Sequence, residues 1–274
     1  MLYFSIIKQT KRTPLLPAAL EGLARFAHLV NVDFFRDLLG VLKSIIRGDK
    51  LDEIDDNDED DTSFDDRAIG TRTRLRLLGI VTAFELLSGQ GEALNIDLND
   101  FITDLYGLIP TLSFDPRVEE VPSSNITSTS TLSVTAPGAR VLHKKSQLAP
   151  SVDLFFRALN LVFFSPYASH SISPPWRAAA FAKRLLSASL YFPPATAVRS
   201  IEFVTALMVR EPKVEALLST EDRTADGVYR ADVDDPQVCN PFASSAFELG
   251  VLEETHWDER VRKAAKSLGK YVRA

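Results

Sequence analysis

The sequence predicts an all-α protein, a HEAT/armadillo-like α-solenoid of helical hairpins with two disordered inserts. Wherever the sequence is periodic, its apolar residues recur at the three- and four-residue spacing of a helix. No stretch carries a pattern strong enough for a sheet, and short turns separate successive helical segments, as in antiparallel hairpins. A strict repeat period is not visible, so a compact helical bundle remains the alternative.

The first two predicted helices form a hairpin. An apolar stripe runs from Leu16 to Val30 at alternating spacings of four and three residues. A second helix is expected over 34–47, with an apolar face so wide that it should be buried on two sides. Asp33 lies in the short turn between them and is the expected N-cap of the second helix.

Residues 48–70 are predicted to be an acidic disordered insert. Eleven carboxylates lie between Asp49 and Asp66, against the single cation Lys50. Such a block repels itself and cannot bury a core. It also explains the net charge of −6, because the rest of the chain is mildly basic. A role as an acidic mimic of nucleic acid, or as a dock for basic proteins, is the alternative.

Two more helices are expected before the middle of the chain. One runs from Leu75 to Leu87 and ends at the Ser88-Gly89 pair, which is typical of a helix C-terminus. The next is capped by Asp97 and runs through Ile109, where Pro110 stops it.

Residues 112–150 are the second predicted insert, rich in Ser and Thr. An edge strand over 126–134 is the alternative, although nothing else in the sequence would pair with it. Apart from the two inserts, residues 1–274 are expected to form a single α-helical domain, because this length suits one large domain.

The C-terminal half predicts further helices after the second insert. Two of these helices are expected to begin with proline. Proline is favourable there because the N–H at the first helical position makes no hydrogen bond within the helix. The expected ranges are 152–164 with Ser151 as cap, 174–190 opened by Pro174, a helix from Pro194 to Pro212, and a hairpin of 241–254 and 258–272. An acidic, turn-rich stretch over 219–240 precedes this last hairpin.

The residues that carry catalysis or bind metals are sparse, so we expect no enzyme, no cofactor and no metal. The single cysteine, Cys239, excludes a disulfide framework and a cysteine-based zinc site. None of the four histidines has a metal-ligand partner at helical spacing: His28, His143, His170 and His256. An unrecognised enzyme with a site in an interhelical pocket is the least favoured alternative.

The sequence predicts no membrane contact. No apolar run approaches the roughly 18 residues that span a bilayer, and the first residues lack the basic and small-residue features of a signal peptide. These first residues resemble the middle of a helix, which indicates a fragment of a longer protein.

The last predicted helix carries cations along one side and an apolar row along another. We call these cations the basic ridge: Arg262, Lys263, Lys266, Lys270 and Arg273. The ridge is predicted to contact RNA phosphates or an acidic partner, and an ordinary solvated face is the alternative.

Arg72 and Arg76 form a second candidate for binding an anion or an acidic partner. They are neighbours at i and i+4 and are expected near the start of a helix. Because the helix dipole disfavours cations there, a bound anion or acidic partner would stabilise them.

Four stretches resemble the C-terminal region of the CCAAT-binding-factor-like nucleolar complex family. They are Pro14–Phe35, Ile80–Asp97, Cys239–Ala243 and the helix that contains Val261–Lys266. The resemblance covers almost all of the chain outside the two inserts. The inserts depart from the shared pattern, and the basic and coiled N-terminal region of the larger family members is missing.

The resemblance implies a non-enzymatic protein of the nucleus and nucleolus. It implies a complex with a second nucleolar complex protein on the pre-60S ribosomal particle, during maturation and intranuclear transport of the large subunit precursor. Direct contact with rRNA would then fall to the basic ridge. An alternative role in DNA replication initiation on chromatin, with origin-recognition and helicase-loading proteins, is implied by yeast-type members. The family has no catalytic motif to carry over.

Overall fold

The computed structural model describes residues 6, 19–20, 22–23, 32–47, 62–90, 98–121, 149–165, 174–219 and 226–271. Every regular element among these residues is helical, which confirms the predicted all-α class. The helix expected over 16–30 lies largely outside the described residues.

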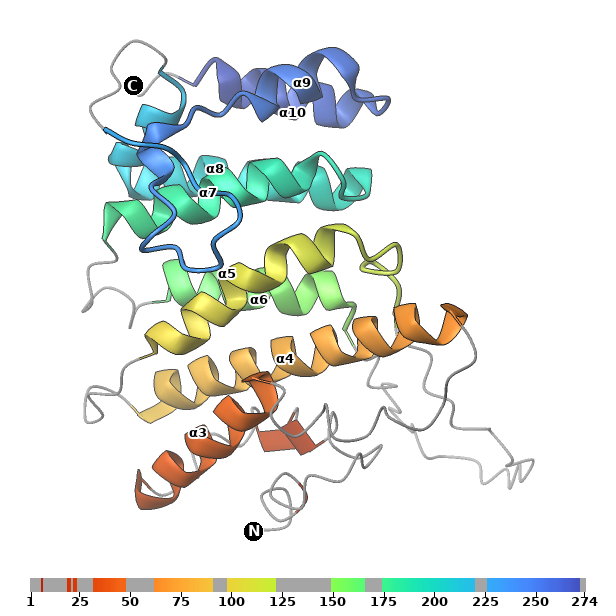
Figure 1. The fold of residues 1–274 in the computed structure, drawn as a ribbon, viewed down its shortest axis with the longest axis vertical. Helices are drawn as coiled ribbons and strands as arrows, with labels where there is room; N and C mark the ends of the chain where they lie inside the picture. Colours follow the sequence, from red (N-terminus) through yellow and green to blue (C-terminus); the bar gives the residue numbers. More distant parts are fainter. Residues whose placement is uncertain are drawn as a thin grey trace, which may run out of the picture.

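The helices are stacked along the longest axis of the molecule (Figure 1). The helices are α3 (Val32–Arg47), α4 (Thr62–Gln90), α5 (Asn99–Ser113), α6 (Ser151–Phe163), α7 (Pro175–Ser189), α8 (Pro194–Arg210), α9 (Glu248–Thr255) and α10 (Glu259–Gly269). From α5 onward they lie in successive layers, α5 and α6 above α4, then α7 and α8, then α9 and α10 (Figure 1). The helices of the last two layers contact each other directly. Because α4 contacts both α5 and α6, α5 contacts α7, and α8 contacts α10, each layer packs on the next.

Helix α3 confirms the helix predicted over 34–47 and begins slightly earlier, at Val32. Asp33 therefore lies inside the helix, and its predicted role as N-cap is wrong. A close approach joins α3 to α4. A Cβ on Gly79 would lie only 3.1 Å from Cγ1 of Ile46, so Ile46 packs directly on the backbone of α4.

Helix α4 is much longer than predicted. It starts at Thr62 rather than at Leu75, so residues 62–70 of the predicted acidic insert are helical, and 48–61 lie outside the described residues. The helix also continues past Gly89 to Gln90, because one glycine disfavours a helix by only about 1 kcal/mol and does not end it alone.

Helix α5 corrects both of its predicted ends. It begins after Leu98 rather than at a cap on Asp97, and it continues through Pro110 to Ser113. Pro110 has no N–H for the carbonyl of Tyr106, four residues earlier. That carbonyl accepts a hydrogen bond from Nη1 of Arg184 in α7, at 3.3 Å. A neighbouring helix therefore supplies the missing donor.

The second predicted insert is shorter than expected, because its first residues pack on the fold. Val118 is buried, and its carbonyl accepts a hydrogen bond from the N–H of Val152 in α6 at 3.0 Å. Glu119 accepts from the N–H and the hydroxyl of Thr196, at 3.0 and 2.5 Å, and so caps the N-terminus of α8. Residues 122–148, including the alternative strand over 126–134, lie outside the described residues.

The helices expected around α6, α7 and α8 are present, with small shifts at their ends. Ser151 is the first residue of α6 rather than its cap, and Pro175 rather than Pro174 is the first residue of α7. Phenylalanine rings join the three helices edge to face. The Phe163 ring centroid lies 5.1 Å from that of Phe181 and 6.2 Å from that of Phe203.

The last hairpin is confirmed in α10 and shortened in α9, which begins at Glu248 rather than near Pro241. The residues Pro241–Ala243 form a separate 3-10 turn, η6. A second 3-10 helix, η5 (Pro212–Leu217), follows α8. The segment over 226–247 runs past α7, and both 3-10 helices contact α7 (Figure 1).

Candidate interaction surface

Helix α10 presents its apolar row to the core and its lysines to solvent. The buried row confirms the predicted packing side: Val261, Ala265 and Leu268. The exposed cations of the basic ridge are Lys263, Lys266 and Lys270. Arg273 lies outside the described residues.

Two ridge lysines already have carboxylate partners. Nζ of Lys263 lies 2.8 Å from Oε1 of Glu259, one turn earlier in α10. Nζ of Lys266 lies 3.1 Å from Oε1 of Glu253 in α9. Both pairs are exposed, and such pairs add little to stability, so a phosphate or another carboxylate could replace the partner.

Arg262 differs from the ridge lysines because its guanidinium folds back onto the protein. Its Nη1 donates to the carbonyl oxygens of His256 at 2.7 Å and Trp257 at 3.0 Å. These carbonyls belong to the turn between α9 and α10. Arg262 therefore holds this turn together, which the helical pattern alone did not indicate.

Arg72 and Arg76 lie in the middle of α4, because this helix begins at Thr62. Their predicted position near a helix start is therefore wrong. Nη2 of Arg76 lies 3.7 Å from Oδ1 of Asp104 in α5, and Arg72 also has an interaction of its own. The argument that the helix dipole calls for a bound anion no longer applies to either residue.

Sequence reasoning missed a buried ion pair between α7 and α9. Nζ of Lys183 lies 2.6 Å from Oε1 of Glu248 and donates to the carbonyl of Ser245 at 2.7 Å. Each of the two charged side chains is only 1% exposed. Burial lowers the pKa of Lys183 from its usual value, and the Glu248 carboxylate opposes this shift. The ring of Phe247 lies 4.1 Å from the ammonium group.

Arg184, the next residue of α7, is buried as well and reaches two other segments. Besides the Tyr106 carbonyl, it binds the carbonyl of Ala231 at 3.0 Å and Oδ1 of Asp234 at 3.0 Å. Helix α7 thus holds α5 and the 226–247 segment together. The sequence signal for these buried cations is their position, side by side within a largely apolar helix. In the structure, 11 of the 15 residues of this helix are buried.

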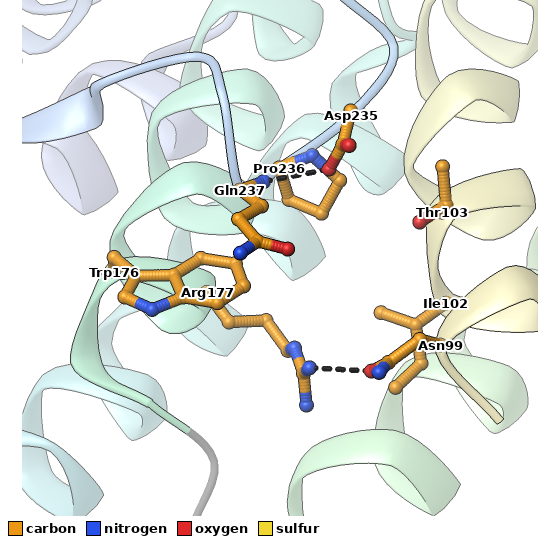
Figure 2. Close-up of a pocket in the computed structure, with 8 residues that line it drawn as sticks. All are labelled: Asn99, Ile102, Thr103, Trp176, Arg177, Asp235, Pro236 and Gln237. Atoms are coloured by element: carbon orange, nitrogen blue, oxygen red, sulfur yellow. Dashed lines mark hydrogen bonds between the residues drawn. The ribbon is translucent and has the colours of Figure 1, made fainter. Parts of the chain in front are cut away.

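A small cavity lies between α5, α7 and the 226–247 segment (Figure 2). Its volume is about 30 Å³, whereas pockets for small molecules are roughly 300–1,000 Å³. Arg177 lies beside Trp176 and extends to α5, where it donates to Oδ1 of Asn99 at 2.7 Å (Figure 2). The cavity has room for about one water molecule and none for a cofactor.

The described part of the chain contains no group of three or more His, Cys, Asp or Glu side chains placed to hold a metal ion. His256 lies in the turn before α10, and the other three histidines lie outside the described residues. Cys239 is buried. Within the described ranges, no helix combines the length and the apolar character needed to cross a membrane.

The sequence pattern of the CBF/Mak21 family matches residues 76–265, from the middle of α4 into α10. The chain belongs to the CBF/Mak21 family. This confirms the resemblance found in the sequence. The family region includes α5 to α9 entirely, α10 as far as Ala265, and the ridge residues Arg262 and Lys263.

Relatives of this CBF/Mak21 chain match it along nearly its whole length. Nucleolar complex-associated protein 3 of Saccharomyces cerevisiae is 31% identical over 97% of the chain and 36% of its own length. Nucleolar complex protein 3 homolog of Homo sapiens is 32% identical over 97% of the chain and 26% of its own length. Nucleolar complex-associated protein 3 of Schizosaccharomyces pombe is 30% identical over 91% of the chain and 31% of its own length. The chain thus spans about a quarter to a third of these relatives.

Proposed function

We propose that this chain is a non-enzymatic scaffold in the biogenesis of the large ribosomal subunit. It acts in pre-60S maturation and intranuclear transport, through a complex with a second nucleolar complex protein. The match to relatives named as nucleolar complex proteins carries this proposal. The same names across yeasts and vertebrates indicate a nucleolar or nuclear location.

The layered helix pairs support the scaffold role. We propose that they form a HEAT-like solenoid, in which α7/α8 and α9/α10 are successive repeats and α5 and α6 form the layer that packs on α4. Such stacks offer long continuous surfaces to protein partners.

Within this scaffold, the three exposed ridge lysines are the candidates for contact with rRNA or an acidic partner segment. Lys263 and Lys266 lie in α10, where each has an exposed ion-pair partner, and Lys270 directly follows the last residue of this helix. Because a lysine that contacts phosphate displaces counterions, affinity for RNA would fall steeply as salt rises. Arg262 is excluded from this set, since changing it would also disturb the turn before α10.

Affinity purification of the tagged full-length protein from nuclear extract, at two salt concentrations, tests the proposal. We expect a second nucleolar complex protein together with large-subunit precursor RNA. Recovery of origin-recognition and helicase-loading proteins without ribosomal RNA would contradict it and favour the replication alternative, which the names of the relatives do not mention.

A charge-reversal variant tests the ridge separately. Replacing Lys263, Lys266 and Lys270 by Glu should reduce recovery of precursor RNA at low salt while helicity and thermal stability stay unchanged. Unchanged recovery at both salt concentrations would mean that the ridge is an ordinary solvated face. Replacing the exposed residues Arg210, the last of α8, and Lys213, in η5, by Glu provides a control with changed net charge.

A further inference from the structure

The turn between α9 and α10 exposes a tryptophan. Trp257 is 77% exposed, more than any other aromatic side chain among the described residues. Large aromatic side chains dominate the energetics of protein interfaces, because they remove a large apolar area from water when they are buried. A tryptophan held in water is therefore a candidate anchor for a partner.

The turn around Trp257 is held by a set of hydrogen bonds. The N–H of Asp258 donates to Nδ1 of His256 at 3.0 Å, and Oδ1 of Asp258 accepts from the N–H of Arg260 at 2.8 Å. Arg262 binds the two carbonyls of the turn, as described above. The ring of His256 stacks beneath that of Trp257, with centroids 5.8 Å apart and planes 18° apart. A side chain held this way loses little further conformational freedom on binding.

The two arginines beside Trp257 are already engaged within the turn. Nη2 of Arg260 lies 2.8 Å from Oδ2 of Asp258, and Arg262 binds the carbonyls of the turn. A nucleic-acid strand that stacked a base on the indole would bring its phosphates against the Asp258 carboxylate. A balanced set of charges around an apolar centre instead matches a protein surface with an apolar pocket and a polar rim.

We infer that Trp257 anchors a partner protein by inserting its indole ring into an apolar pocket of that partner. Arg262 is a positioning residue, which acts by holding the carbonyls of the turn. The inference rests on the proposed function for the identity of the partner, the second nucleolar complex protein. It adds the surface through which the last helix pair binds that partner.

Fluorine NMR of the 274-residue chain labelled with 5-fluorotryptophan tests this directly, because the chain has only two tryptophans. The variant Trp176→Phe assigns the two signals. On titration with the purified second nucleolar complex protein, we expect the Trp257 signal to shift and to lose its sensitivity to D2O. The Trp176 signal should keep both its position and that sensitivity. Single-stranded polyuridine should leave the Trp257 signal unchanged.

Variants give the binding readout. Trp257→Ala should raise the Kd for the partner by at least about 30-fold, the effect of an interface anchor. Tyr191→Ala, which removes another aromatic side chain that is 61% exposed, should leave the Kd unchanged. Arg262→Met should raise the Kd less than Trp257→Ala does, and it should narrow the Trp257 fluorine signal of the free chain, because the turn gains mobility.

The outcomes separate this inference from the proposed function. A complex that forms with an unchanged Trp257 signal, or an unchanged Kd for Trp257→Ala, would overturn the inference alone. A Trp257 signal that responds to polyuridine and not to the protein would also overturn it. Failure of the unmodified chain to bind the purified partner at all would contradict both the inference and the proposed complex.

Discussion

Removing one partner of the Lys183–Glu248 ion pair should destabilise the chain much more than replacing both partners by apolar residues. Both side chains are 1% exposed, and the ammonium and carboxylate groups are 2.6 Å apart. Removing one partner leaves the other charge buried without compensation, at a cost of about 3–5 kcal/mol. Glu248→Leu or Lys183→Met should therefore each lower the melting temperature by about 6–20 °C.

The double variant Lys183→Met/Glu248→Leu removes both charges and keeps similar side-chain volumes. Replacement of buried ion pairs by apolar residues is often neutral or stabilising. Here the Ser245 carbonyl loses its donor, which costs about 1–3 kcal/mol. We therefore expect the double variant to lose no more than about 3 kcal/mol of its free energy of unfolding. This loss is well below the sum of the losses of the two single variants.

Urea unfolding followed by circular dichroism, with all four chains of the cycle, measures this coupling. The exposed pair of Lys266 in α10 and Glu253 in α9, changed to Met and Leu, is the matched control. Its removal should change stability by less than about 1 kcal/mol. Additivity of the Lys183 and Glu248 effects within about 0.5 kcal/mol would refute the reasoning that the two charges depend on each other.

Arg184→Met should destabilise the chain, because the Tyr106 carbonyl loses its donor. The loss should be about 1–3 kcal/mol smaller when Pro110→Ala is also present, because the new backbone N–H can bind that carbonyl. Equal losses with and without Pro110→Ala in urea unfolding would contradict this. Burial raises the pKa of Tyr229 to about 12. Since the unfolded tyrosine ionises near pH 10 and the folded one does not, stability should be lost between about pH 10 and 12. Tyr229→Phe should reduce that loss in urea midpoints measured from pH 9 to 11.5, and an unchanged slope would argue against the assignment. Phe203→Ala should lower the free energy of unfolding by about 3–5 kcal/mol, since its ring packs on two phenylalanines of α6; a loss below about 1 kcal/mol would mean that these contacts are dispensable.

The helices themselves followed from the sequence, because their apolar spacing reflects burial along a whole element. Their ends did not follow, because end signals are local and tertiary contacts can override them. Pro110 is tolerated inside α5 once Arg184 supplies a donor to the Tyr106 carbonyl. Glu119 likewise caps α8 from a segment 77 residues away in sequence, where the sequence shows only proline at the helix start.

The buried polar side chains of α7 lay beyond sequence reasoning for a similar reason. The pattern around Lys183 and Arg184 shows a helix that is apolar on all sides, which predicts burial but identifies no partner. Glu248 is 65 residues away from Lys183, inside the helix predicted over 241–254, where nothing in the sequence identifies it as the partner. Only the packing of α9 on α7 brings the two charges together.

The basic ridge shows how far a helical pattern supports a functional argument. Spacing alone groups Arg262 with Lys266 and Lys270, because all three occupy one sector of α10. The structure separates them, since Arg262 binds the carbonyls of the Trp257 turn while both lysines extend into solvent. Substitutions in this sector should therefore fall into two classes. Changes at the lysines should alter binding that depends on salt, whereas changes at Arg262 should alter binding through Trp257 even at high salt.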